Sequence, residues 1–228
     1  MTRVLVLRAR EDAERTATRL RAMGFMPLLS PVLEIVATGA AMPEGVFDAV
    51  LATSAKGLEF CAEPGETLNL PLYAVGARTA QIARELGWRT ELVAGETRAL
   101  MPVIHARHET PARFLYLAGR DRHDDLEVGL RLAGHDLTVL ETYEARAATA
   151  LSKEAARALA NSEMDVTLHY SRRSAEIFMA LARQAGLTEA LGGIDHLALS
   201  KDAASPLPRA RIAKRPDEEH LLRLLQGG

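Results

Sequence analysis

The chain has 228 residues, of which 48% are hydrophobic and 25% charged, and its formal net charge is −2. These values are typical of folded globular proteins and exclude a disordered, collagenous or coiled-coil chain. The small net charge argues against a dedicated nucleic-acid binder, and the aromatic content of 4% disfavours an aromatic platform for bases or sugars.

A single cysteine, Cys61, excludes an intramolecular disulfide and a cysteine metal site, which fits a reducing cytosol. The first ten residues, MTRVLVLRAR, are typical of a strand rather than a signal peptide. No apolar run approaches the ~20 residues of a membrane span. We therefore expect a cytoplasmic protein with neither a membrane nor a nucleic-acid partner.

Short apolar runs alternate with Ala/Leu/Arg-rich segments of helical period along the chain. The expected strands occupy residues 3–9, 47–54, 71–76, 114–119, 165–171 and 196–200. Most are nearly continuous apolar runs, as in parallel sheets covered by helices on both faces. Four helical segments end in Arg-x-x-Gly, a typical helix stop, at Gly24, Gly87, Gly134 and Gly186. The pattern predicts an α/β fold with parallel sheets.

Two extended stretches, 27–38 and 137–148, are too long for simple strands. They bracket a middle block of about 100 residues, a typical domain size. We therefore predict a discontinuous first domain (1–31 and 148–228) and an inserted second domain (38–142), joined by connector strands at 32–37 and 143–147. A single sheet with longer strands is the alternative.

A cation follows each of the six expected strands, usually beside Gly, Ser or Thr. These cations are Arg8 and Arg10, Lys56, Arg78, Arg120 and Arg122, Arg172 and Arg173, and Lys201. Ligands of open α/β sheets bind outside the carboxyl ends of the strands, where helix N-termini also favour anions. The pattern favours a polyanion site in a cleft between two domains. Solvated loop arginines are the alternative, because 24 of the 28 cations are arginine.

Motifs for phosphate loops, dinucleotide binding and hydrolase elbows are absent from the sequence. His105 and His108 are spaced for one helix face but have no obvious third ligand, so we interpret them as surface residues and predict no metal site. Tyr143, in the second connector, is by default a strand aromatic. A connector tyrosine facing a gap between domains would instead be able to donate a proton to a leaving group.

The sequence resembles uroporphyrinogen-III synthases over nearly its whole length. The matching pieces follow the family's order and are VLVLRA with Arg8, AMGF, PVLEI, FDAVLATSAKG, PLYAVGARTA, FLYLAG, LETYEAR and LHYSRRSA. The most specific of them are the VGxxTA motif, the tyrosine of the second connector and the serine after the fifth strand. The resemblance implies two α/β domains joined by a two-stranded connector.

The resemblance also implies a reaction, a lyase step in porphyrin and haem biosynthesis. The implied substrate is hydroxymethylbilane, a linear tetrapyrrole with eight carboxylates. Loss of the terminal hydroxyl as water is followed by inversion of ring D through a spiro intermediate and closure to uroporphyrinogen III. The resemblance implies no metal and no organic cofactor, and it suggests a monomer.

Site residues follow from the same resemblance. Tyr143 matches the family's acid candidate, and Thr79, in VGxxTA, is the second catalytic candidate. The expected substrate-binding residues are Arg8, Ser54, Gly76, Arg78, Gly119, Arg120, Arg122, Ser171 and Ser200. One corner departs from the family: the stretch Ser200-Lys201-Asp202-Ala203 replaces a threonine pair, and Pro206 and Pro208 shorten the next helix. His123 stands near a position where the family often has arginine, with Arg122 beside it as a replacement.

Two other functions fit the sequence less well. A catalytically silent binder of an anionic small molecule on the same fold would explain the altered last loop, since fold alone does not fix function. An enzyme acting on a phosphorylated sugar or nucleotide would lack its glycine-rich phosphate loop. Turnover of a pyrrole substrate separates the synthase from both.

Overall fold

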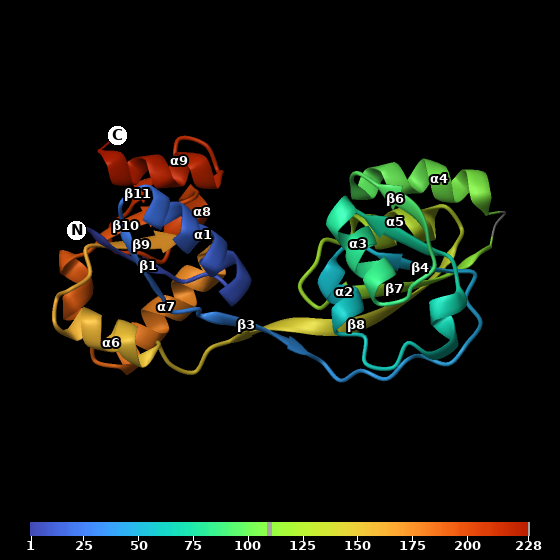
Figure 1. The fold of residues 1–228 in the computed structure, drawn as a ribbon, viewed down its shortest axis with the longest axis horizontal. Coiled ribbons are helices and arrows are strands. Elements are labelled where there is room, and N and C mark those ends of the chain that lie inside the picture. The colour runs from blue at the N-terminus through green and yellow to red at the C-terminus, as the bar shows by residue number, and fades with distance from the viewer. Residues whose placement is uncertain (109–110, 228) are drawn as a thin grey trace. The chain divides into compact units, whose positions relative to one another are not determined.

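The computed structural model describes residues 1–108 and 111–227 (Figure 1). Its strands are β1 (Arg3–Val6), β2 (Met26–Leu29), β3 (Leu33–Ala37), β4 (Ala49–Ala52), β5 (Leu72–Val75), β6 (Thr90–Ala94), β7 (Arg113–Gly119), β8 (Asp136–Ala147), β9 (Val166–His169), β10 (Asp195–Ala198) and β11 (Arg211–Ile212). Its α-helices are α1 (Arg10–Ala22), α2 (Ala55–Glu59), α3 (Ala77–Glu85), α4 (Leu100–Arg107), α5 (Asp125–Leu132), α6 (Lys153–Ala160), α7 (Arg172–Gln184), α8 (Lys201–Ala204) and α9 (Glu218–Arg223). Short 3-10 turns are η1 (Gly65–Asn69), η2 (Thr97–Ala99), η3 (Glu189–Gly193) and η4 (Leu224–Gln226).

The chain divides into two compact units. Unit 1 consists of Met1–Glu34 and Arg146–Gly228, and unit 2 of Ile35–Ala145. The chain passes from one unit to the other twice, first along β3 and then along β8. Each unit has its own sheet and its own apolar core.

The sheet of unit 1 has the order β11-β10-β9-β1-β2, and its paired strands run parallel. Helices cover both faces, so alternate residues of β1 enter two different cores. Leu5 packs with α6 and α7 on one face, whereas Val4 and Val6 pack with α1 and α9 on the other. This two-sided burial explains why β1 is a continuous apolar run.

The sheet of unit 2 has the order β3-β8-β7-β4-β5-β6. The pairs β4·β5, β4·β7, β5·β6 and β7·β8 are parallel. Helices α2 and α3 cover one face through a core around Val50 and Leu117, and α4 and α5 cover the other through a core around Leu51 and Phe114. The parallel order places the carboxyl ends of β7, β4 and β5 side by side at one edge.

The predicted α/β class with parallel sheets is confirmed. The glycines of the four Arg-x-x-Gly stops have φ between 72° and 85°, the left-handed conformation that the helix stop requires. Helix α8 has only four residues and ends before Pro206, as predicted. Among the described residues, no helix combines the length and apolar character needed to cross a bilayer.

Two local expectations were incomplete. The stretch 27–38 breaks into β2 and β3, but the stretch 137–148, predicted to be too long for a simple strand, belongs almost entirely to the single strand β8 of 12 residues. Strand β11 has only two residues and was not predicted, because two residues show no periodicity.

Candidate active site

The residues predicted for the site gather at the carboxyl edge of each sheet. In unit 2, Ser54 follows β4, Gly76 follows β5 and Gly119 ends β7, and these three strands are neighbours. The same relation holds in unit 1, where Arg8 follows β1 and Ser171 follows β9. Each unit therefore has one polar edge, which is the edge where ligands of open α/β sheets bind.

Three of these residues are serines that begin helices. The hydroxyl oxygen of Ser54 accepts from the Lys56 amide at 3.3 Å. Ser171 and Ser200 cap α7 and α8 in the same way, each at 3.2 Å. A capping oxygen uses its lone pairs and leaves its own proton available, so Ser54 and Ser200 satisfy their helices and still have a donor. The hydroxyl of Ser171 lies 2.9 Å from that of Ser174.

The start of α3 combines a glycine, a cation and a buried hydroxyl. Gly76 has φ +85° and precedes the helix, a backbone conformation that L side chains rarely adopt. Arg78 is exposed, whereas Thr79 is 6% exposed and lies in the first turn. The Thr79 hydroxyl makes no hydrogen bond with another described residue, so it is free to contact a ligand above the first turn.

Tyr143 lies against the last residue of β7. A Cβ built on Gly119 would stand 2.6 Å from Cζ and 2.9 Å from the hydroxyl oxygen of Tyr143, so only glycine permits this contact. The Phe60 ring is tilted beside the phenol, with 6.1 Å between the ring centroids. The ring is therefore held between β7 and the end of α2, at the polar edge of unit 2.

The tyrosine hydroxyls differ in their partners. The hydroxyl of Tyr73 lies 2.8 Å from Nε2 of His108, and that of Tyr170 donates to a carboxylate at 2.8 Å. The hydroxyl of Tyr116 lies 2.7 Å from the hydroxyl of Thr53. Tyr143, within the described residues, has no hydrogen-bond partner for its hydroxyl. It is the tyrosine whose proton remains available to a ligand.

Arg120 and Arg122 bind carboxylates of their own unit. Arg122 donates to Glu127 at 2.6 Å and to Glu141 at 2.8 Å, and its side chain is 20% exposed. Arg120 donates to Glu141 at 3.2 Å and also pairs with Glu144. The bonds from Arg122 and Arg120 hold the pKa of Glu141 below its usual value, so this carboxylate stays charged at neutral pH. A ligand carboxylate would have to share both guanidinium groups with these glutamates.

Arg8 is paired in a similar way in unit 1. Its Nη1 lies 3.0 Å from Oε1 of Glu218, and its guanidinium lies 4.1 Å from the centroid of the Tyr170 ring. Thr16 and Tyr170 donate to the same carboxylate at 2.6 and 2.8 Å, and Arg19 pairs with it. Burial alone would raise the pKa of Glu218, but these hydrogen bonds outweigh it and leave the pKa below its usual value.

Glu218 and Glu141 were missed by sequence reasoning. Glu218 lies 210 residues from Arg8, and no local pattern connects them. Glu141 lies in β8, two residues before Tyr143, between two buried residues of the strand. This alternation was the one sequence signal that could have indicated Glu141 as a partner of Arg122.

The two histidines near the end of α4 have different surroundings. His105 is exposed, as predicted, but His108 contacts Tyr73 and packs edge-on against Phe114 at 5.1 Å between ring centroids. His108 is therefore half-buried, so the surface interpretation fits it only in part. Of the residues that the structure describes, no group of three or more His, Cys, Asp or Glu could hold a metal ion.

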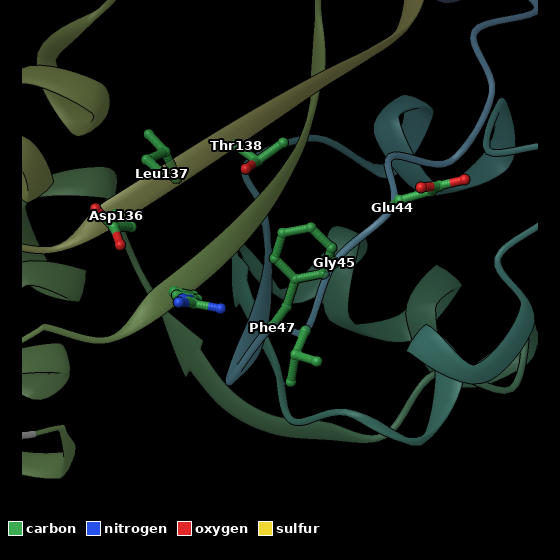
Figure 2. A pocket seen from close by; sticks show the side chains of 8 residues that line it. Glu44, Gly45, Phe47, Asp136, Leu137 and Thr138 are labelled. Atoms are coloured by element: carbon green, nitrogen blue, oxygen red, sulfur yellow. The ribbon is translucent and has the colours of Figure 1, made fainter.

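A shallow pocket of about 410 Å³ lies at the other end of the unit 2 strands (Figure 2). Asp136 and Leu137 at the start of β8 line one side, and Glu44 and Phe47 on the loop before β4 line the other. None of the predicted site residues is among its lining residues. The polar carboxyl edge and this pocket are thus separate features of unit 2.

The fold and the site define a class of protein with two parallel α/β units. Each unit has hydroxyl and cationic groups at the carboxyl edge of its sheet. At the edge of unit 2, the phenol of Tyr143 has no hydrogen-bond partner among the described residues. The family model described as uroporphyrinogen-III synthase HemD matches residues 14–223. The chain belongs to the uroporphyrinogen-III synthase family. It is a cyclising lyase of haem biosynthesis, and its substrate is a tetrapyrrole.

Two solved structures that the chain matches bear the name of this family. The uroporphyrinogen-III synthetase of Helicobacter pylori is 18% identical, with a TM-score of 0.63 over 99% of both chains. A mutant uroporphyrinogen III synthase of Thermus thermophilus is 23% identical over 100% of this chain and 97% of the other, with a TM-score of 0.49. The first likeness supports the fold. A search of the curated proteins found no match.

Proposed function

We propose that Tyr143 donates the proton, or a strong hydrogen bond, to the terminal hydroxyl of hydroxymethylbilane as it leaves. The observation behind this proposal is the hydroxyl of Tyr143, which has no partner among the described residues, whereas those of Tyr73, Tyr116 and Tyr170 are hydrogen-bonded. Hydroxide is a poor leaving group, and a phenol keeps its proton at neutral pH until one is needed.

Thr79 is the second catalytic group of the proposal. Its hydroxyl lies in the first turn of α3, where the free backbone amides of the helix also favour an anion. We assign it to one carboxylate of the tetrapyrrole. By holding that side chain, Thr79 would keep the linear chain folded while the ring closes.

The remaining assignments concern the eight carboxylates. Arg78 is exposed beside Thr79, and Ser54 and Ser200 each keep a hydroxyl proton to donate. Ser171 would bind a carboxylate in exchange for its contact with the Ser174 hydroxyl. Gly76 lets the backbone approach a ligand closely at the end of β5, whereas the space beside Gly119 is taken by the Tyr143 ring, so Gly119 would act by admitting that ring. Arg8, Arg120 and Arg122 would bind substrate by sharing their charge with the glutamates that they already contact.

Positioning provides most of the rate enhancement in this proposal. Loss of the hydroxyl leaves an azafulvene cation that the substrate's own pyrroles stabilise. Ring D must then attack through its substituted carbon to form the spiro intermediate, a geometry that the free chain seldom adopts. Holding reacting groups in place contributes several kcal/mol, on the order of 7–11 in favourable cases, without a strong acid or base.

The decisive experiment supplies hydroxymethylbilane from a coupled enzyme and separates the oxidised porphyrin isomers by chromatography. Spontaneous closure gives isomer I, and the synthase reaction gives isomer III. We expect isomer III to dominate. Isomer I alone, from a folded sample, would contradict the assignment and favour a silent binder of anionic molecules.

We also propose that the enzyme works in the cytoplasm as a monomer without nucleic-acid partners. The single cysteine and the small net charge support this setting. Light scattering of the purified protein at several concentrations measures the oligomeric state directly, and a mass twice that of the chain would contradict the monomer.

A further inference from the structure

We infer that Thr142 and Gly119 are positioning residues that together fix the place of the Tyr143 phenol. The inference deepens the proposed function and rests on Tyr143 being the proton donor. Thr142 directly precedes Tyr143 in β8 and is 2% exposed, so it is not itself available to a substrate. Its effect on the reaction would act through its neighbour.

The Thr142 hydroxyl ties three elements together. It donates to the carbonyl oxygen of Gly57 in α2 at 2.9 Å and lies 3.5 Å from the carbonyl oxygen of Ala118 in β7. A buried hydroxyl without a partner is unfavourable, so the bond restricts β8 to one position relative to α2 and β7.

Helix α2 is close enough for this bond because Gly57 has no side chain. A Cβ on Gly57 would lie 2.5 Å from the carbonyl oxygen of Leu117. The helix therefore contacts the backbone of β7 directly, and the Gly57 carbonyl reaches Thr142. Phe60, at the end of the same helix, packs beside the Tyr143 ring.

The ladder between β7 and β8 is irregular at this point. Ala118 pairs with Glu141, but the next pair is Gly119 with Tyr143, so Thr142 is skipped. An unbroken register would have paired Gly119 with Thr142 and moved Tyr143 one step beyond the end of β7. Such bulges redirect side chains and are over-represented beside active sites.

The backbone around the skipped residue is held as well, because the amide of Thr38 donates to the carbonyl oxygen of Thr142 at 3.0 Å. The Thr142 hydroxyl binds Gly57, and the amide of Arg120 donates to the carbonyl oxygen of Tyr143 at 2.9 Å. The Tyr143 ring then rests on the bare α-carbon of Gly119. Without the threonine bond the bulge can relax, and without the glycine the ring must move. A displacement of about 1 Å is enough to slow a positioned reaction by as much as ~100-fold.

The first test is a pair of substitutions at Thr142, measured in the coupled assay with isomer separation. Thr142→Val keeps the shape and removes the hydroxyl, and we expect kcat to fall about tenfold with KM within about twofold. Thr142→Ser keeps the hydroxyl and is expected to restore kcat to within about threefold of the wild type. Thr138→Val is the matched control, an exposed threonine on the same strand, and should leave kcat unchanged.

The second test asks whether Thr142 acts through Tyr143. In a Tyr143→Phe background there is no hydroxyl to misplace, so Thr142→Val should change kcat less than about twofold further. A tenfold loss in both backgrounds would show a separate structural role and overturn the inference. Wild-type kcat in a folded Thr142→Val protein would overturn it as well.

Gly119→Ala is a second, independent variant that tests the inference if the Thr142→Val protein does not fold. The added methyl carbon would lie 2.6 Å from Cζ of Tyr143, a clash that the ring relieves by swinging away. We expect a loss of kcat of at least about tenfold that again disappears in the Tyr143→Phe background. Equal losses in both backgrounds would overturn the inference here too. Wild-type kcat in Tyr143→Phe alone would instead contradict the proposed function.

Discussion

In unit 1, Arg8 at the end of β1 is bound by Glu218, a residue from the last α-helix, whereas in unit 2 the phenol of Tyr143 has no partner among the described residues. Both groups lie at the carboxyl edge of a parallel sheet, although Arg8 was predicted as a cation after a strand and Tyr143 as the tyrosine of the second connector. Arg8 in unit 1 already makes an ion pair within the protein, whereas the hydroxyl of Tyr143 in unit 2 is available to a ligand.

A cation at the end of a strand is therefore not by itself a sign that the residue is free to bind a ligand. Arg8, Arg120 and Arg122 all have carboxylate partners in their own unit, while Arg78 is exposed. The paired arginines stabilise the fold at the edge and keep it electrically balanced. The uncharged donors Tyr143, Ser54 and Ser200 are the groups whose hydroxyl protons have no partner among the described residues.

The largest expected effect is on catalysis in unit 2. Tyr143→Phe removes the unpaired hydroxyl, and we expect kcat to fall about 100-fold, or roughly 2.7 kcal/mol, because proton donation to the leaving group is lost. Substrate positioning remains, so activity should stay above the uncatalysed rate. Initial rates of isomer III formation measure this change.

Tyr73→Phe is the control for that variant. It removes a hydroxyl that contacts His108 in the interior of unit 2, and kcat should stay within about twofold of the wild type. If kcat fell equally in the two variants, the missing hydrogen-bond partner of Tyr143 would not identify it as the catalytic tyrosine.

A smaller effect, on stability, is expected in unit 1. Glu218→Ala leaves Arg8, Thr16 and Tyr170 without their shared acceptor, and the free energy of unfolding should fall by about 2 kcal/mol. Urea denaturation measures it. Under folding conditions kcat should change less than about threefold, because Glu218 only holds Arg8 in place and has no role in the chemical step.

The neighbouring Glu219 is a matched control, since it pairs only with Arg223 on the surface, as far as the described residues go. Glu219→Ala should lower the free energy of unfolding by less than about 0.5 kcal/mol. If Glu218→Ala reduced kcat strongly at unchanged stability, Glu218 itself would take part in the reaction, and the contrast between the units would disappear.

A further effect on stability depends on pH and concerns the buried imidazoles of unit 1. Burial, and then the neighbouring His196, lowers the pKa of His169 from 6.5 to about 3. Between these values the unfolded chain binds a proton that the folded chain excludes, so stability decreases as the pH falls through this window. The slope attributable to His169 is at most about 1.4 kcal/mol per pH unit.

Urea unfolding at pH 7, 6 and 5 tests this contribution. His169→Gln cannot titrate and should show a flatter dependence of unfolding free energy on pH than the wild type. His123→Gln, at an exposed position, should keep the wild-type slope. Identical slopes in the two variants would rule out His169 as the source.

Much of the fold could be predicted because its signals are local. Apolar runs such as Val4 to Leu7 indicate strands buried on both faces, and Arg-x-x-Gly at Gly24 ends a helix within four residues. The domain boundaries stay a prediction, although they lie close to the division between the two units.

The sequence predicted which residues belong to the site, but it did not predict which residues they contact. Sequence motifs led to Tyr143, Thr79 and Gly119, yet the pairing of Arg8 with Glu218 spans 210 positions and has no local signature. The bulge that skips Thr142 was equally invisible, because register is decided by packing across strands rather than by the pattern along one strand.

The division of unit 1 into two chain segments has a consequence for synthesis on the ribosome. Strand β1 pairs with β2 on one side and with β9 on the other, but β9 starts at Val166, after the whole of unit 2. At about 5–20 residues per second, the apolar edge of β1 waits roughly ten to thirty seconds for that partner. Unit 2 is contiguous and can fold during this interval. The nascent chain therefore needs its first strand shielded from aggregation longer than any other element of the sheet.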